Sequence, residues 1–316
     1  MHNYTLPSEV ILCEVGPRDG LQNERILLST DQKIELIERM ADAGARVIEI
    51  GSFVHPKAVP AMADTDEVAR GIRKKDGVEY RALVLNRRGM ERALASGVTK
   101  VKLTVSASPT HSKQNSNRTP EEVVRSFEEC AEFAGANGLT LSGAIATAFG
   151  YYAEGTIGLG LVAPLAEAYM SFGVDEISMS DSTGFANPKQ VYEYMKELSE
   201  KHPQVDWTLH AHNTRGMAMA NIYAALLAGV KRFDSSFAGI GGCPFAPGAS
   251  GNVATEDVVN MMDGMGIKTG YDLDSVIKAA IAVQELIGHE SDSAMLKLRR
   301  GISAAKSGCT SPACEV

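Results

Sequence analysis

The sequence lacks the features of a secreted or membrane-anchored protein. No stretch approaches the roughly 18 uninterrupted apolar residues that a membrane-spanning helix needs. Residues 1–5 are not a basic segment leading into an apolar run, so they do not resemble a signal or transit peptide. The five cysteines are an odd number at irregular spacings, which argues against a disulfide framework. We therefore expect a cytoplasmic protein, in a reducing compartment, that makes no membrane contact.

Basic residues are in deficit as well. The chain carries 31 Lys and Arg against 39 Asp and Glu, a net charge of −8. A nucleic-acid-binding protein needs a basic face, so this balance argues against such a partner. It does not exclude an anionic small molecule as a ligand, because a local group of Arg and Lys can be positive although the net charge of the protein is negative. With 44% hydrophobic residues among 316, the chain can bury a core that needs no disulfide or structural metal.

Short apolar segments alternate with amphipathic helical segments along the chain. Residues Ser29, Thr119 and Asn187 mark helix starts, because each can cap the backbone that follows. Eight strand–helix units predict a closed parallel α/β barrel, the (β/α)8 or TIM barrel. An open doubly wound sheet is the alternative, but residues 16–20 are not the Gly-rich turn of a dinucleotide-binding sheet. The expected strands are residues 10–16, 46–52, 79–85, 100–106, 140–147, 174–180, 206–212 and 232–237.

The C-terminal part of the chain extends the barrel pattern. Residues 272–300 predict two further helices packed beside it. No repeat, linker or charge block marks a second domain. We expect a single catalytic domain over residues 1–302, followed by a small, polar and mobile tail over residues 303–316.

Reactive residues follow two of the expected strands, and active sites of such barrels lie at the C-terminal strand ends. Arg18 and Asp19 follow the first strand, and the seventh strand ends in His210 and His212. Alternate residues of a strand face the same side, so both imidazoles point together. Two imidazoles and a carboxylate can form a divalent-metal site. Taken alone, the two histidines would as often be core or surface residues.

A glycine-rich segment, residues 239–252, follows the eighth strand. Glycine permits positive φ angles and close approach of the backbone to a ligand. The segment also carries one thiol, that of Cys243. We interpret it as a lid that brings a reactive cysteine over the site, with a flexible surface turn as the alternative.

Three motifs resemble those of 3-hydroxy-3-methylglutaryl-CoA (HMG-CoA) lyases. They are residues 14–24 (EVGPRDGLQNE), 52–60 (SFVHPKAVP) and 238–252 (AGIGGCPFAPGASGN). The resemblance runs in register from about residue 10 to residue 300. It implies a metal-dependent TIM-barrel lyase that splits the acyl-CoA substrate into acetyl-CoA and acetoacetate, with Mg²⁺ or Mn²⁺ as cofactor. It also implies a homodimer with a part in leucine catabolism.

The resemblance further implies roles for single residues. Arg18 would stabilise the enolate, Cys243 would transfer a proton, and His210 or Asp19 could act as the base. The implied metal ligands are Asp19, His210, His212 and Asn252. The implied catalytic residues are Arg18, Asp19, Glu49, His210 and Cys243. The implied substrate-binding residues are Arg18, Gln22, Ser178 and Asp181.

Three of these residues also have simpler interpretations. Without the motif, Asn252 is a turn residue, because Gly-Asn pairs are common in turns. Asp181 at a strand end is as often a helix N-cap. Glu49 could serve only to brace Arg18.

Four loops at the expected barrel mouth depart from the family pattern. They are residues 108–112, 147–155, 180–182 and 212–216. We expect a remodelled acyl pocket that takes a different 3-hydroxyacyl group, with neutral drift as the alternative. The residues expected to remodel it are Phe149, Tyr151 and Tyr152 as apolar walls, and Arg215 or His111 as a positive group.

Three other functions fit parts of the pattern. A related metal barrel could condense acetyl-CoA with a 2-oxo acid, but such enzymes usually carry a further C-terminal region. A metal-dependent hydrolase usually takes its His-x-His pair from the first strand rather than the seventh. A non-catalytic barrel would be expected to have lost Asp19, a histidine or Cys243, and none is lost.

Overall fold

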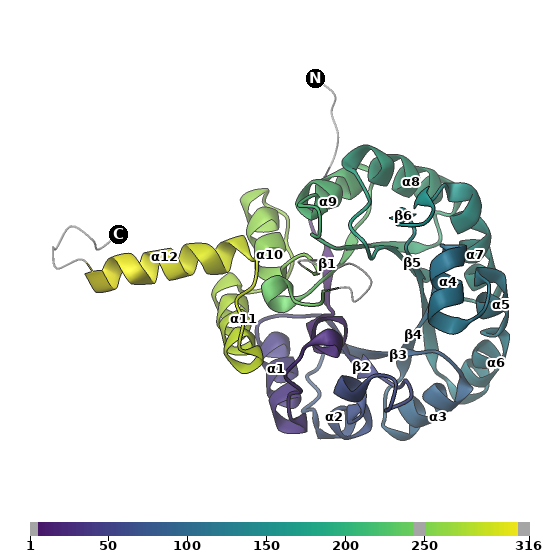
Figure 1. Ribbon diagram of the computed structural model, residues 1–316, viewed down its shortest axis with the longest axis horizontal. Helices are drawn as coiled ribbons and strands as arrows, with labels where there is room; N and C mark the ends of the chain where they lie inside the picture. The colour runs from purple at the N-terminus through teal and green to yellow at the C-terminus, as the bar shows by residue number, and fades with distance from the viewer. Residues whose placement is uncertain (1–5, 243–250, 309–316) are drawn as a thin grey trace.

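Eight parallel strands close into a barrel in the order β1-β10-β9-β8-β5-β4-β3-β2, which confirms the expected fold class. The computed structural model describes residues 6–242 and 251–308, with the backbone alone for residues 303–308. Figure 1 looks down the barrel, with the helices as an outer ring. The strands are β1 (Ile11–Glu14), β2 (Val47–Ser52), β3 (Glu79–Val84), β4 (Lys100–Ser106), β5 (Thr140–Ala146), β8 (Glu176–Asp181), β9 (Asp206–Ala211) and β10 (Arg232–Ser235).

The outer helices begin where the sequence marks their caps. Ser29 and Thr119 both form reciprocal capping boxes, and Asn187 accepts a hydrogen bond from the backbone of Gln190 at 3.1 Å. A short antiparallel hairpin, β6 (Gly150–Tyr151) with β7 (Gly155–Thr156), follows β5. The helices up to the last strand are α1 (Thr30–Asp42), α2 (Thr65–Gly71), α3 (Arg87–Ala95), α4 (Pro109–Ser116), α5 (Pro120–Arg125), α6 (Glu128–Asn137), α7 (Leu159–Ser171), α8 (Pro188–Lys201) and α9 (Ala218–Leu227).

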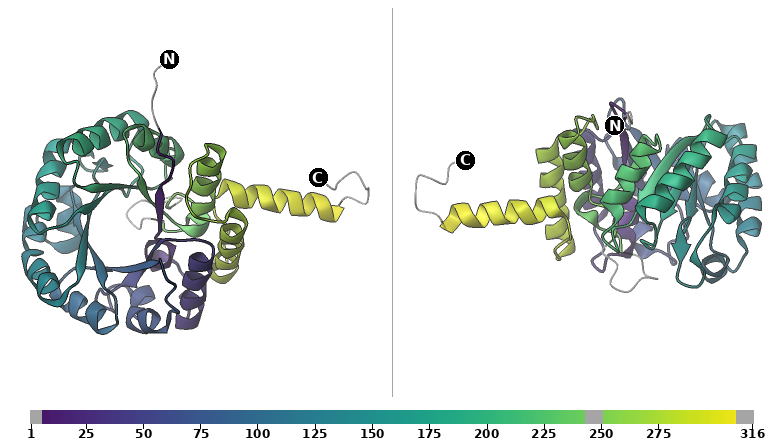
Figure 2. Two further views of the ribbon diagram at one scale, coloured as in Figure 1. Left: turned by 180° about the vertical axis from the view of Figure 1, so that it is seen from behind. Right: turned by 90° about the horizontal axis from the view of Figure 1, so that it is seen from above.

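Three helices follow the barrel, and the last of them differs from the expectation. α10 (Thr255–Gly264) and α1 both pack against α11 (Leu273–Ile287). α12 (Ala294–Gly308) projects away from the barrel in Figures 1 and 2. It continues past Ser303, so the expected boundary between a domain and a tail does not coincide with the end of the helix. Residues 309–316 lie outside the described residues. No helix in the described part of the chain is long and apolar enough to cross a membrane.

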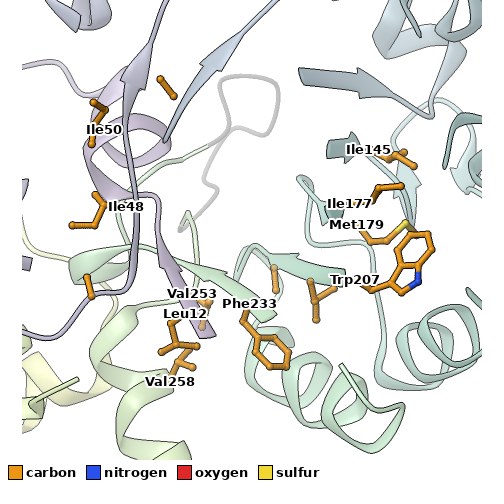
Figure 3. Packing of buried hydrophobic residues seen from close by; sticks show 14 of the residues in the cluster. Leu12, Ile48, Ile50, Ile145, Ile177, Met179, Trp207, Phe233, Val253 and Val258 are labelled. Carbon is orange, nitrogen blue, oxygen red and sulfur yellow. The ribbon is translucent and has the colours of Figure 1, made fainter. Parts of the chain in front are cut away.

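Strand alternation separates an apolar outer face of the barrel from a polar interior. Ile177 and Met179 of β8 are fully buried, and Figure 3 shows them beside Trp207 of β9. Ser178 and Ser180 alternate with them along β8 and so face the other way, into the barrel. The outer face packs the helices, and the inner face is left for polar groups.

An ionic cluster fills the N-terminal end of the barrel. Glu176, the first residue of β8, pairs with Arg81 and accepts hydrogen bonds from Lys100 at 2.6 Å and Arg232 at 3.0 Å. Burial would raise the pKa of Glu176, but these cations outweigh it and lower the pKa to about 2. The cluster occupies this end of the barrel, so a ligand site belongs at the opposite end.

A second buried carboxyl ties β1 to the chain that follows β10. Oε1 of Glu14 accepts hydrogen bonds from the backbone of Gly16 at 2.7 Å and of Phe237 at 3.0 Å. The hydroxyl of Thr255 donates to Oε2 at 2.8 Å. Burial raises the pKa of Glu14 to about 8, although these hydrogen bonds act in the opposite direction.

Glu14→Gln is expected to weaken the pH dependence of stability. The folded-state pKa, about 8, lies above the ordinary 4.5, so folding takes up a proton that the unfolded chain releases. This contribution is present at about pH 4 and is lost as the pH rises through about 8. The wild type should therefore lose more free energy of unfolding than Glu14→Gln between about pH 5 and pH 9, as measured by urea unfolding. Equal losses would contradict a raised pKa.

Candidate active site and metal centre

A cavity of about 440 Å³ opens at the C-terminal ends of the strands. Five residues of the implied site line it, from β1, β9 and the turns that follow them. These five are Arg18, Asp19, Gln22, His210 and His212. The location agrees with the general position of active sites in TIM barrels.

Two groups of residues in the remaining wall of the cavity differ in polarity: one is apolar and the other bears hydroxyl groups. The apolar part comes from β3 and the loop after β2, and consists of Val54, Ala58, Val59, Leu83 and Leu85. The hydroxyl-bearing part comes from β4, β8 and its turn, and consists of Thr104, Ser106, Ser180 and Ser182. A ligand with one apolar and one polar end would therefore be oriented by the cavity itself.

Asp19, His210 and His212 meet in this cavity. Asp19 lies on a single π-helical turn, Gly16–Gly20, that follows β1, and the histidines lie at the end of β9. Oδ2 of Asp19 is 3.8 Å from Nε2 of His210 and 3.7 Å from Nε2 of His212. The two Nε2 atoms are 3.0 Å apart. One donor atom from each residue lies within 4.8 Å of the others, a set that suits a divalent ion.

Asn252 joins this group through the backbone. It pairs with His212 as an antiparallel bridge, which places its side chain beside Asp19. Nδ2 donates to Oδ2 of Asp19 at 2.8 Å and to the carbonyl of Ile240 at 3.0 Å. Within residues 6–242 and 251–308, Oδ1 of Asn252 is buried without a hydrogen-bond partner. An orphaned amide oxygen next to three donor atoms fits a fourth metal ligand, because a bound ion would satisfy it.

Arg18 is held by two carboxylates. Its Nη1 donates to Asp19 at 2.5 Å, and its Nε pairs with Glu49 of β2. Glu49 is fully buried and is not part of the cavity wall, so the structure favours the bracing interpretation of this residue. Burial would raise the pKa of Glu49, but Arg18 and Lys102 lower it, so it is an anion.

Lys102 and Asp234 are buried parts of the site that the sequence analysis missed. Nζ of Lys102 lies 2.8 Å from Glu49 and 3.4 Å from Asp234. Asp234 lies 3.2 Å from Nδ1 of His210. An ionised carboxylate only accepts hydrogen bonds, so Nδ1 carries a hydrogen, and in the neutral imidazole that a metal ligand must be, Nε2 then presents its lone pair to the cavity. The sequence does carry a signal for these two residues: charged residues stand at alternate positions of the strands that contain Lys102 and Asp234.

Negative charge is in excess among these buried groups. Among the residues that the structure describes, the carboxylates of Asp19, Glu49 and Asp234 form ion pairs with two permanent cations, those of Arg18 and Lys102. Burial would raise the pKa of Asp19, but Arg18 and the histidines hold it well below its usual range. Asp19 is therefore an anion that a divalent cation would complement.

Ser178 and Asp181 do not line the cavity, in contrast to their implied role in substrate binding. Ser178 lies deeper in the barrel and its hydroxyl donates to Asp234 at 3.3 Å. Oδ1 of Asp181 accepts from the backbone of Ala186 at 3.1 Å, so this carboxyl shapes the turn after β8. Burial raises the pKa of Asp181 to about 6. The side chains that reach the cavity from β8 and its turn are those of Ser180 and Ser182.

The aromatic residues expected to remodel the pocket lie outside its wall. Phe149 is fully buried against Tyr194, with ring centroids 5.8 Å apart. Tyr152 is about half exposed. The hydroxyl of Tyr151 donates to Gln114 at 2.8 Å.

The two expected positive groups are also placed differently. The guanidinium of Arg215 stacks over Phe185, 3.8 Å from the ring centroid, away from the cavity. His111 does line the cavity, where its ring contacts Tyr151 edge-on at 5.2 Å. Burial lowers the pKa of His111, so it is a neutral group at neutral pH.

Part of the glycine-rich segment is described by the structure. Asn23 donates to the carbonyl of Gly242 at 3.0 Å, so the segment leaves the barrel directly beside the metal group. Gly241 has φ +113°, in the region that favours glycine. Cys243 lies outside the described residues, so its expected role as a lid thiol stays a prediction.

Comparisons with known proteins agree with this geometry. The chain matches the model of the HMGL-like family over residues 9–283. It is 42% identical to the hydroxymethylglutaryl-CoA lyase YngG of Bacillus subtilis, over 92% of this chain and 98% of that protein. A crystal structure of the HMG-CoA lyase of Bacillus subtilis matches with a TM-score of 0.90 and 41% identity, over 93% of this chain and 99% of the other. An HMG-CoA lyase of Acinetobacter baumannii, solved with coenzyme A and 3-methylmalate, matches with a TM-score of 0.87 and 40% identity, over 92% and 95%.

The fold and these matches define a TIM-barrel enzyme of the carbon–carbon lyase class. Within that class, the chain belongs to the HMGL-like family. The family resemblance of the sequence motifs is thereby confirmed.

Gly241→Ala is expected to weaken divalent-metal binding while the protein stays folded. An added Cβ would lie 2.4 Å from Nδ2 of Asn252 and 3.0 Å from the carbonyl of Asp19, so Asn252 must move. We expect the Kd for Mn²⁺ to rise by about tenfold, the lower end of losses caused by misplaced ligands. Electron paramagnetic resonance titration measures free Mn²⁺ directly.

The matched control is Gly229→Ala. Gly229 also has a positive φ, +91°, but nothing lies within 4 Å of its added Cβ. This variant should lose stability through the same backbone strain and keep its Mn²⁺ affinity. Unchanged Mn²⁺ binding in Gly241→Ala would show that Asn252 is not a ligand.

Proposed function

We propose that this enzyme is a divalent-metal-dependent HMG-CoA lyase that cleaves the C2–C3 bond of HMG-CoA into acetyl-CoA and acetoacetate. The observation that carries the proposal is the meeting of Asp19, His210 and His212 with Arg18 in one cavity at the barrel mouth. The named activity of relatives that are about 40% identical over most of the chain supports the substrate.

The residues proposed to hold the ion are Asp19, His210, His212 and Asn252. Mg²⁺ and Mn²⁺ both suit a mixed set of oxygen and imidazole ligands. A bound ion would supply Lewis acidity to the substrate's C3 hydroxyl. Asp19 serves as a ligand rather than as the base, because its low pKa makes it a poor proton acceptor at neutral pH.

The reaction is a retro-Claisen cleavage. The C3 hydroxyl gives its proton to a base, for which His210 is proposed as the remaining candidate of the two that the family resemblance implies, C3 becomes a carbonyl carbon, and the electrons of the C2–C3 bond pass to C2. Acetyl-CoA therefore leaves as an enolate, whose negative charge collects on the thioester oxygen. The guanidinium of Arg18 is proposed to donate to that oxygen, and such a preorganised donor stabilises the charge that develops in the transition state.

Glu49 and Gln22 keep these groups in place. Glu49 holds the Nε of Arg18, which leaves the far side of the guanidinium for Asp19 and the cavity. Nε2 of Gln22 donates to Oδ1 of Asp19 at 3.2 Å and its side chain lines the cavity. Preorganisation of this kind limits the reorganisation needed during the reaction.

The two parts of the cavity wall suggest how the substrate lies. Ser180 pairs in register with His210, so the hydroxyl-bearing wall is adjacent to the metal group. We propose that this wall receives the carboxylate end of the acyl group. The apolar wall from β3 and the loop after β2 would then contact the pantetheine arm.

The remaining roles are proposals from the sequence and the family. Cys243 would return a proton to the enolate at C2 when its segment covers the cavity. A cytoplasmic location, a homodimer and a part in leucine catabolism also stay predictions. The competing reaction, condensation with acetyl-CoA, would need a second substrate, a 2-oxo acid. The cleavage assay described next distinguishes condensation from cleavage.

A cleavage assay tests the proposed function. Metal-loaded enzyme should release acetyl-CoA from HMG-CoA. His210→Ala and Cys243→Ala should each lower kcat by about 100-fold or more, because the first loses a proposed metal ligand and the second loses the proposed proton donor. His202→Ala, a histidine at the end of α8, is the control and should keep its activity. Wild-type enzyme that binds Mn²⁺ but leaves HMG-CoA intact would overturn the substrate and direct the search to other 3-hydroxyacyl-CoA thioesters.

Arg18→Gln tests the enolate-stabilising role. Removal of one such donor typically lowers kcat by about 10²–10³-fold, and KM should change much less, because the charge exists only in the transition state. Arg39→Gln, on the exposed face of α1, is the control. A rise in KM with an unchanged kcat would show that Arg18 only binds the substrate.

A further inference from the structure

Lys102 is the group that joins the two halves of the buried site. Its side chain is 3% exposed and lies in the middle of β4, at a position facing the barrel interior. Its ammonium group contacts Glu49 on one side and Asp234 on the other, at 2.8 Å and 3.4 Å. Each of these carboxylates in turn holds one functional residue, Arg18 or His210.

We propose that Lys102 is a positioning residue that sets the geometry of the metal ligand His210 and of Arg18 at once. The inference rests on the metal site proposed above, although not on the identity of the acyl-CoA. The contacts form a closed ring in which nitrogen groups alternate with carboxylates. In order, its members are Arg18, Glu49, Lys102, Asp234, His210 and Asp19.

The ring explains why a lysine is tolerated in this place. A buried ammonium group is costly unless it is paired, and Lys102 is paired twice. Without it, Glu49 would keep its pairing with Arg18, but Asp234 would lose its contacting ammonium group and would face the anion of Glu49 directly. Their repulsion would turn Asp234 away from Nδ1 of His210, and the imidazole would lose the contact that aims Nε2 at the cavity.

A purely electrostatic role makes the opposite prediction for metal binding. The positive charge of Lys102 repels a bound cation, so its removal alone should tighten Mn²⁺ binding. Loss of positioning should weaken binding, because a reoriented imidazole is a poorer ligand. The sign of the change in Kd therefore separates the two roles.

The test is Mn²⁺ titration of Lys102→Met in the absence of substrate. We expect the Kd to rise by about tenfold or more, as is typical when the partner of a ligating histidine is lost. Lys100→Met is the matched control: Lys100 lies on the same strand and pairs with Glu176 and Glu79 at the N-terminal end of the barrel. It should lower the thermal midpoint and leave the Kd unchanged. An unchanged or lower Kd in Lys102→Met would overturn the proposal.

A charge-balanced double variant covers the case in which Lys102→Met does not fold. Lys102→Met/Asp234→Ala removes one cation and one anion, and is compared with Asp234→Ala. If Lys102 acts on the ion through Asp234, its removal should raise the Kd by less than about twofold in this background. A further tenfold rise would show that Lys102 acts independently of Asp234 and would overturn the proposal.

The kinetic readout separates this inference from the proposed function. At saturating Mn²⁺, Lys102→Met should lower kcat through the displaced Arg18, with little change in KM for the thioester. A rise in KM alone would mean that Lys102 contacts the substrate directly and would overturn the positioning role. Wild-type protein that binds Mn²⁺ and fails to cleave HMG-CoA would overturn only the substrate, because the titrations need none.

Discussion

An excess of buried negative charge at the barrel mouth is the constraint on which this site depends. Three carboxylates lie there against two permanent cations, and ionised groups are costly to bury unless they are paired. Each cation therefore bridges two carboxylates: Arg18 contacts Asp19 and Glu49, and Lys102 contacts Glu49 and Asp234. A divalent ion at this position would complete the pairing and leave the site positive, which suits an anionic thioester substrate. The excess of carboxylates lowers the stability of the site without an ion, and the same excess would bind the ion.

The barrel makes this concentration of charge possible. Its strands place apolar side chains outward against the helices and leave the interior to polar groups, so ionic clusters can form at both ends. The cluster around Glu176 closes the N-terminal end and pairs three cations with three carboxylates, because Arg81, Lys100 and Arg232 contact Glu79 and Asp206 as well as Glu176. The cluster around Asp19 is not balanced and adjoins a cavity. The difference in charge balance, rather than in burial, distinguishes the structural cluster from the proposed functional one.

The chain that returns after β10 completes the site. Its backbone pairs with His212 through Asn252, and the buried carboxyl of Glu14 receives hydrogen bonds from this returning chain and from the turn that carries Asp19. Gly241 allows the two segments to lie close together, because a Cβ at this position would collide with Asn252 and with the backbone of Asp19. Segments from the two ends of the barrel sequence therefore act as one unit, and Gly241 of the glycine-rich motif is needed for this packing.

The sequence by itself determined the strand order of a closed barrel, the helix caps and the family, because these depend on local periodicity, capping chemistry and contiguous motifs. It also predicted Asp19, His210 and His212 as site residues from their places at strand ends, and Asn252 from the family motif. Only the tertiary structure decided which side chains reach the cavity. Ser178 and Asp181 share a strand with Ser180, yet only Ser180 lines the wall, and Lys102 is central although no motif marks it. Periodicity predicts which face of a strand a side chain occupies. How deep the side chain lies in the barrel, and which residues it contacts, depend on the stagger of the strands and the paths of the loops, which are set by contacts between residues far apart in the chain.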